Sequence, residues 1–173
     1  MNNAELACTF NSIRGGDKTA FEELYNDMKT PIYTVIYRIT WDQSISEDIL
    51  QEVFVKLFVS PLPPSIKNPR AYIFQMARNL AVNGAGSQAR HVSLDEIPDA
   101  VHQPLDDYSL RMDIEDALKS LPAQECQIVT MHIIGELRFR EISGIMQMPL
   151  GTALWKYQKA KEKLRAFISG GTS

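Results

Sequence analysis

The stretch IIGELRFREISGIMQMPLGTALWKYQKAKEKLR, residues 133–165, has the pattern of a helix-turn-helix that ends in a basic helix. Apolar residues recur at intervals of three and four on both sides of Pro149, and the proline interrupts the periodicity between them. They are Phe139, Ile142, Ile145 and Met146 in the first predicted helix, over residues 138–147, and Ala153, Tyr157, Ala160 and Leu164 in the second. Such a pair of helices presents its second member to the major groove of DNA.

Local charge favours the same interpretation. Between Leu150 and Ile168, five lysine or arginine residues accompany a single acid, Glu162, in a chain whose formal net charge is −3. DNA phosphates attract a helix of this composition. The alternative is a solvated helix face, because two amphipathic helices around a proline occur in many all-helical proteins.

Length and composition limit the fold and the compartment. The 173 residues suffice for one medium domain or two small ones. Cys8 and Cys126 are too few and too far apart for a disulfide framework or a metal cluster, so we expect a reducing, cytoplasmic environment and neither metal nor cofactor. The sequence has no recognisable signal peptide and no apolar run long enough to span a bilayer.

Helical periodicity in the first half predicts a bundle of helices. The first covers about residues 3–13, and the second follows Asp17 as its N-cap. We expect a new helix to start at Pro31, because proline suits a first helical turn. Another runs from Ser44, which forms a capping box with Glu47, to about residue 60.

Two segments interrupt this pattern. The proline-rich residues 61–69 cannot be helical and predict a rigid, exposed loop. Residues 91–110 hold five acids and no lysine or arginine, which predicts a flexible acidic linker over residues 89–108. A structured loop is the alternative there, because a few apolar side chains could dock. The other predicted helices cover residues 70–82, ended by Gly84 and Gly86, then 109–120 and 122–134.

Five segments carry a family resemblance. They are GDKTAFEELY (16–25), SEDILQEVFVKLF (46–58), NPRAYIFQMARNLA (68–81), SLPAQ (120–124) and FREISGIMQMPLGT (139–152). In this order they resemble the successive signatures of extracytoplasmic-function sigma factors, the smallest group of the sigma-70 family. The resemblance implies an all-α protein of two small helical domains, with sigma region 2 over residues 5–88 and sigma region 4 over 109–169.

The resemblance also implies a function. The chain would bind core RNA polymerase and direct transcription from specific promoters, with no catalytic chemistry of its own. Promoter DNA and an anti-sigma factor are the further implied partners, and the anti-sigma factor would hold the cytoplasmic protein at a membrane. Region 4 would read the minus-35 element as a duplex, and region 2 would hold melted minus-10 bases.

The implied minus-35 contacts lie in the helix-turn-helix. They are Thr152, Trp155, Lys156 and Lys159 on the second helix, with Arg138 and Arg140 near the DNA backbone. Leu154 and Trp155 replace the basic residue and the serine that are common at these positions. Either of the two could pack against a thymine methyl group or a sugar. The alternative is that Trp155 covers the domain core, and we favour it because large aromatic side chains pack more often than they read bases.

The implied minus-10 contacts lie in the proline-rich loop and the helix after it. They are Ser65, Lys67 and Asn68 in the loop, then Tyr72, Arg78 and Asn79. Flipped bases need such a pocket and stacking surfaces. Phe74 is equally well explained as a core residue. After Ala81 the chain reads VNGAGSQARH, where the family has a strongly basic run, so we expect weaker contacts to the adjacent duplex.

The implied polymerase contacts are Asp48, Gln51, Glu52 and Lys56, which match the face that docks on the clamp helices of the largest subunit. Region 4 would contact the flap region. A coil of about 20 residues spans about 25 Å, whereas one and a half turns of duplex cover about 55 Å. We therefore expect the polymerase to stretch the linker, and the isolated chain to bind promoters poorly.

Two other functions compete with this one. A sigma-like adaptor or helix-turn-helix regulator that does not itself initiate transcription would explain the missing basic run. An enzyme would have to use Glu125, Cys126 and His132, but side chains so close together on one helix point in different directions and form no base-orienting arrangement.

Overall fold

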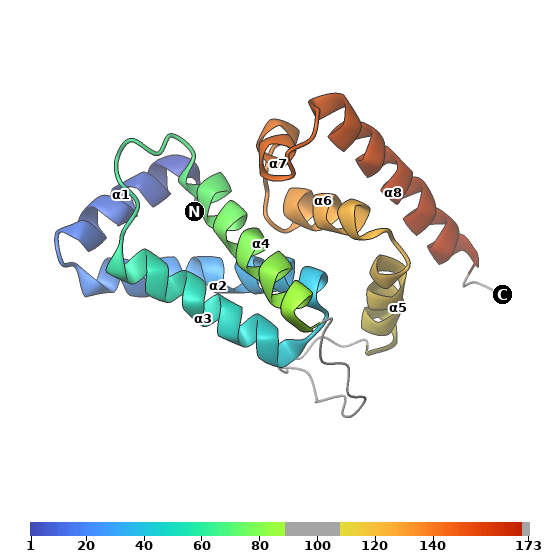
Figure 1. The fold of residues 1–173 in the computed structure, drawn as a ribbon, viewed down its shortest axis with the longest axis horizontal. Coiled ribbons are helices and arrows are strands. Elements are labelled where there is room, and N and C mark those ends of the chain that lie inside the picture. The colour runs from blue at the N-terminus through green and yellow to red at the C-terminus, as the bar shows by residue number, and fades with distance from the viewer. Residues whose placement is uncertain (89–107, 171–173) are drawn as a thin grey trace.

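In a computed structural model that describes residues 1–88 and 108–170, every regular element is an α-helix (Figure 1). None of these helices combines the length and the apolar character needed to span a membrane. The helices are α1 (Asn3–Arg14), α2 (Lys18–Thr40), α3 (Gln43–Val59), α4 (Pro69–Gln88), α5 (Tyr108–Lys119), α6 (Ala123–Ile133), α7 (Phe139–Ile145) and α8 (Leu150–Gly170). The predicted all-α fold is thus confirmed.

The first lobe, α1–α4, packs around the long helix α2. Leu24, Met28, Ile32 and Ile36 form a fully buried stripe on α2, which packs against α3 and α4. This stripe continues past Pro31, so α2 is one helix and the prediction of a new start at Pro31 is wrong. Packing on both sides compensates for the hydrogen bond that the proline removes.

The N-cap of α2 is the residue predicted from the sequence, whereas the N-cap of α3 is not. The Asp17 carboxylate accepts hydrogen bonds from the backbone N–H groups of Thr19 and Ala20 and caps α2, as predicted. The predicted cap of α3 is wrong: Asp42, not Ser44, accepts from the Ile45 N–H at 2.8 Å. The Asp42 carboxylate, two residues before Ser44, is therefore the N-cap of the helix.

Helix α4 is longer than predicted. It continues to Gln88 and passes through Gly84 and Gly86, which we expected to end it. The Gly84 backbone packs closely on α3, where an added Cβ would lie 3.0 Å from Ile49 Cδ1. Tertiary packing here outweighs the low helix propensity of glycine. The predicted linker, residues 89–108, lies outside the described residues except for Tyr108, which begins α5.

The second lobe, α5–α8, packs directly on the first. Helix α6 contacts α2, and α7 contacts α4 (Figure 1). Ile128 and Met131 of α6 belong to the same buried cluster as the core of the first lobe. The two predicted domains therefore share apolar surface, which the sequence patterns of the separate lobes did not indicate.

Candidate nucleic-acid interface

The predicted helix-turn-helix is formed by α7 and α8. Ile142 and Ile145 of α7 and Ala153 and Ala160 of α8 are buried, as the apolar spacing predicts. The turn between the helices uses Gln147, whose φ of 52° lies in the left-handed region. This conformation reverses the chain within a few residues, so that α8 packs back against α7.

One face of α8 carries the predicted minus-35 contacts. Thr152, Trp155, Lys156 and Lys159 are spaced by three and four residues and share this face, which lies beside the buried Ala153 and Ala160. Trp155 is exposed, and the other three are half-buried. Trp155 is 56% exposed, so the expectation that it covers the core is wrong. The core is closed by smaller side chains, and the Trp155 ring lies 5.9 Å from Lys156 Nζ. An exposed aromatic ring beside a cation is suited to contact with DNA.

The basic side chains of the helix-turn-helix differ in their exposure and in their ion pairs. Arg138 and Arg140 are exposed at the start of α7, beside the turn that precedes it. Lys159 pairs with the exposed Glu162 at 2.9 Å, a contact that a phosphate can replace at little cost. Lys163 instead donates to both oxygens of the buried Glu125 on α6 and holds the lobe together.

The predicted minus-10 contacts are spread along one loop and one helix. Ser65, Lys67 and Asn68 are exposed in the loop of residues 61–69, and Tyr72 and Asn79 are exposed on α4. The arrangement leaves these five side chains accessible to a strand that follows α4. The neighbouring Phe74 is fully buried and is a core residue.

Arg78 differs from the other minus-10 residues. Its Nε donates to the Gln127 side-chain oxygen of α6 at 3.0 Å, so its guanidinium is engaged by the second lobe. Burial at this contact lowers the pKa of Arg78 from its usual value, although a guanidinium stays protonated at neutral pH. The sequence had no signal for this contact, because it joins residues 49 positions apart.

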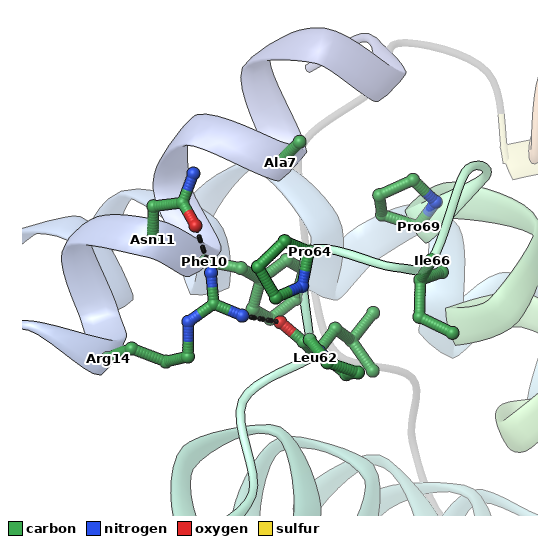
Figure 2. Close-up of a pocket in the computed structure, with 9 residues that line it drawn as sticks. Ala7, Phe10, Asn11, Arg14, Leu62, Pro64, Ile66 and Pro69 are labelled. Atoms are coloured by element: carbon green, nitrogen blue, oxygen red, sulfur yellow. Dashed lines mark hydrogen bonds between the residues drawn. The ribbon is translucent and has the colours of Figure 1, made fainter.

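A pocket of about 140 Å³ lies between the proline-rich loop and α1 (Figure 2). Its walls are mainly apolar and include Phe10, Leu62 and Pro64. Arg14 donates to the Leu62 carbonyl oxygen at 2.7 Å and also to the Asn11 side-chain oxygen, so α1 holds one end of the loop. Sequence reasoning missed Asn11 and Arg14, since nothing local to α1 links it to a loop about 50 residues later.

The predicted polymerase contacts form an exposed stripe on α3. Asp48, Gln51, Glu52 and Lys56 are all exposed, and Lys56 pairs with Glu52 at 3.3 Å. The same face carries two apolar residues that the sequence analysis omitted, Val55 and Val59, which are 59% and 75% exposed. They follow the polar residues at helical spacing and could have been found by extending that stripe.

The three residues considered for an enzyme have structural contacts. His132 lies between the rings of Phe139 and Tyr157, and its Nδ1 is 3.0 Å from the Leu137 carbonyl oxygen. Burial raises the pKa of the Cys126 thiol, which disfavours the nucleophilic thiolate. Glu125 pairs with Lys163. These contacts account for the residues without any reaction.

Family models match both lobes. The model described as Sigma-70 region 2 matches residues 24–91, and that described as Sigma-70, region 4 matches residues 111–164. Together they cover more than two thirds of the chain. Each match contains one of the two candidate DNA-contacting surfaces.

Relatives are similar over nearly their whole length. The ECF RNA polymerase sigma factor SigM of Bacillus subtilis is 21% identical over 158 residues, which cover 88% of this chain and 97% of SigM. SigW of the same organism is 24% identical over 170 residues, covering 88% of this chain and 91% of SigW.

Solved structures share the fold. CnrH, in complex with the cytosolic domain of CnrY, aligns with a TM-score of 0.68 at 13% identity over 96% of this chain and 98% of CnrH. The sigma factor RpoE of Bartonella quintana, in complex with the anti-sigma factor NepR, aligns with a TM-score of 0.69 at 16% identity over 86% of this chain and 96% of RpoE. The chain thus belongs to the sigma-70 family, as an extracytoplasmic-function sigma factor that directs transcription initiation.

Proposed function

We propose that this sigma factor binds core RNA polymerase through a region 2 domain over residues 5–88 and reads its promoters with both lobes. A region 4 domain over residues 109–169 binds the minus-35 element, and residues 89–108 link the two. The observation that carries this proposal is one face of α8, where the exposed Trp155 lies with the half-buried Lys156 and Lys159 beside a buried stripe.

At the minus-35 element, α8 enters the major groove. Thr152 and Trp155 face the base edges, and Lys156 and Lys159 neutralise phosphates. Arg138 and Arg140 contact the backbone from the start of α7. Each lysine–phosphate contact contributes about 0.9 to the slope of log affinity against log salt concentration.

At the minus-10 element, the loop of residues 61–69 and α4 hold the opened strand. Ser65, Lys67 and Asn68 contact a flipped base, while Tyr72, Arg78 and Asn79 follow the strand along α4. Arg14 fixes one end of this loop beside the neighbouring apolar pocket, because it donates a hydrogen bond to the Leu62 carbonyl oxygen. A preformed loop loses less conformational entropy on binding.

The exposed stripe of α3 docks on core polymerase. Asp48, Gln51, Glu52 and Lys56 bind the clamp helices of the largest subunit, and region 4 binds the flap region. Solvent exposure of all four side chains, with Val55 among them, supports this assignment. An apolar centre with a polar rim is the usual composition of a protein interface.

An anti-sigma factor is the proposed inhibitor. The two structural neighbours were solved as CnrH with CnrY and as RpoE with the anti-sigma factor NepR. Their similarity supports a partner of this class for the present chain. The sigma factor itself acts in the bacterial cytoplasm, and a membrane-bound partner would retain it there.

Run-off transcription tests the function. Purified chain is mixed with core polymerase and a library of genomic fragments, and transcript starts are mapped by sequencing. We expect transcripts that share an upstream motif and that are absent with core polymerase alone. Failure to associate with core polymerase would refute the proposal. Association without initiation would favour the alternative, a sigma-like adaptor, which the missing basic run after Ala81 also favours.

A substitution on α3 tests the polymerase contact. Val55→Ser should weaken binding to core polymerase at least tenfold, because it removes exposed apolar surface from the proposed interface. Val82→Ser on α4 is the matched control, since Val82 is also exposed, at 40%, but lies outside the stripe. Binding is measured by fluorescence anisotropy without DNA. Equal affinity of the two variants would contradict the assignment of α3.

A further inference from the structure

The first two turns of α8 carry an exposed patch of unusual composition. Its members are Gly151, Leu154, Trp155 and Gln158, and each lies three or four residues from two of the others, so the patch is contiguous. Leu154 is 39% exposed and Trp155 is 56% exposed. A Cβ added at Gly151 would meet no atom within 4 Å. This α8 patch is therefore more accessible than the half-buried lysines beside it.

The charges around the α8 patch indicate the class of its partner. Lys156 and Lys159 lie along one edge, and Lys161 lies beyond the other. The Lys156 Nζ is 5.9 Å from the centroid of the Trp155 ring. Glu162, one turn after the patch, pairs with Lys159. A strip with cations on both flanks fits a DNA groove, because phosphates run along both rims of the groove while base edges form its floor.

The side chains of the patch fit some base pairs and not others. In the major groove, thymine presents a 5-methyl group, whereas guanine presents the acceptors O6 and N7, which need donors such as those of arginine. Leu154 can contact a methyl group but leaves guanine acceptors unpaired, at the cost of their desolvation. The Gln158 amide both donates and accepts, so it can form two hydrogen bonds to N6 and N7 of adenine.

We infer that Leu154 and Trp155 read thymine methyl groups and that Gln158 reads adenine, so that α8 selects an upstream element with A·T pairs at these positions. This inference rests on the proposed insertion of α8 into the major groove and specifies the bases that it recognises there. It also gives a function to the departure at positions 154 and 155, where a basic residue and a serine are common in the family. The departure exchanges a guanine-binding cation for a methyl-binding surface.

The test uses base analogues that each remove one group from the DNA. The full chain with core polymerase first selects its preferred duplex from a library of random sequence. In that duplex, each upstream thymine is replaced in turn by deoxyuridine, which lacks the 5-methyl group, and each adenine by 7-deazaadenine, which lacks the N7 acceptor. Fluorescence anisotropy measures binding. We expect deoxyuridine at one or two positions to weaken binding about fourfold, which is the value of one buried methyl group.

Variants of the patch assign each base contact to a side chain. Leu154→Ala should bind the thymine and deoxyuridine duplexes more nearly equally, and Gln158→Ala should lose the discrimination against 7-deazaadenine, since each pair closes a double-mutant cycle. Phe167→Ala is the matched control, because Phe167 is 40% exposed on the same helix but outside the patch. It should keep both discriminations.

A gain of new specificity is the sharper test. Leu154→Arg restores a donor for guanine O6 and N7, so the selection repeated with this variant should replace an A·T pair of the motif by a G·C pair. The slope of log affinity against log salt concentration should not decrease in this variant, because it carries an additional cation. An unchanged motif would show that position 154 does not face a base.

Two other results would overturn the inference. The first is a selected motif in which deoxyuridine never weakens binding. The second is a methyl effect that stays complete in both Leu154→Ala and Trp155→Ala, since other residues would then read the methyl group. Weaker binding of these variants to core polymerase without DNA, with DNA discrimination intact, would likewise identify the patch as a protein contact. A selection that enriches no motif removes the proposed function itself, whereas an enriched motif without methyl dependence removes only this inference.

Discussion

Trp155 is the residue at which sequence reasoning and structure differ most clearly. Aromatic side chains are usually buried, yet this one is 56% exposed on the proposed DNA-binding face. The alanines at positions 153 and 160 already fill the space against the rest of the lobe. An exposed tryptophan that does not stabilise the core is free to contact a ligand.

Trp155→Ala should therefore leave stability almost unchanged and weaken DNA binding. The expected change in the free energy of unfolding is within about 0.5 kcal/mol, since the side chain is not in the core. Affinity for minus-35 duplex DNA, in complex with polymerase, should fall about tenfold or more. Urea unfolding and anisotropy titration measure the two effects. A loss of several kcal/mol in stability would show that the ring packs after all.

At the scale of elements, α4 shows how packing overrides local propensity. Its two glycines predicted an end near residue 82, but the helix continues to Gln88. The two positions differ in their surroundings. An added Cβ at Gly86 would meet no atom within 4 Å, whereas at Gly84 it would press on Ile49 of α3.

Alanine substitutions at these positions should have different effects. Gly86→Ala should raise the free energy of unfolding by about 0.5 kcal/mol, because alanine loses less backbone entropy in a helix. Gly84→Ala should gain less or lose stability, because Ile49 must move by a few tenths of an ångström. Thermal unfolding of the two variants measures the difference. A larger gain at Gly84 would mean that α3 and α4 are less closely packed there.

At the scale of the whole molecule, the contact between the lobes decides which surfaces are accessible. Burial of Ile128 and Met131 is worth about 1.5–3 kcal/mol for each side chain. The polar contact between Tyr37 of α2 and Glu115 of α5, at 3.3 Å, adds to it.

The contact between Tyr37 and Glu115 should stabilise the fold less at acidic pH. Burial alone would raise the pKa of its carboxyl, but hydrogen bonding and charge from Lys119, together with Arg38 and Tyr37, lower it below the usual 4.5. A carboxyl with a lowered pKa in the folded state contributes stability above pH 4.5, and that contribution is lost as the pH falls through the lower value. Its size is at most about 1 kcal/mol, because a third of the side chain is exposed.

Glu115→Gln should abolish this part of the pH dependence. Unfolding by urea is measured between pH 7 and pH 3 for the unaltered chain, Glu115→Gln and the neighbouring control Asp116→Asn. We expect a smaller loss of stability on acidification only in Glu115→Gln. Parallel curves for all three proteins would rule out a contribution from Glu115.

The amino-acid sequence by itself determined the helices, the helix-turn-helix and the family. These depend on spacing within one segment and on the order of motifs, such as the apolar positions Ile142, Ile145 and Ala153 that are buried as predicted. The four predicted contact residues on α3 are exposed on one face, because residues three and four apart share a helix face whatever lies around them. On α8 only Trp155 is exposed, and the other three are half-buried.

Only the tertiary structure decided which part of the molecule, or the solvent, each helix face contacts. The unbroken course of α2 past Pro31, the exposure of Trp155 and the bond from Arg78 to Gln127 depend on contacts between distant residues. Helix α6 illustrates the reason: its apolar pattern states that two sides must be covered, but not that one of them is covered by the other lobe. Periodicity is a local property, whereas the choice of packing partner follows from the free energy of the whole chain.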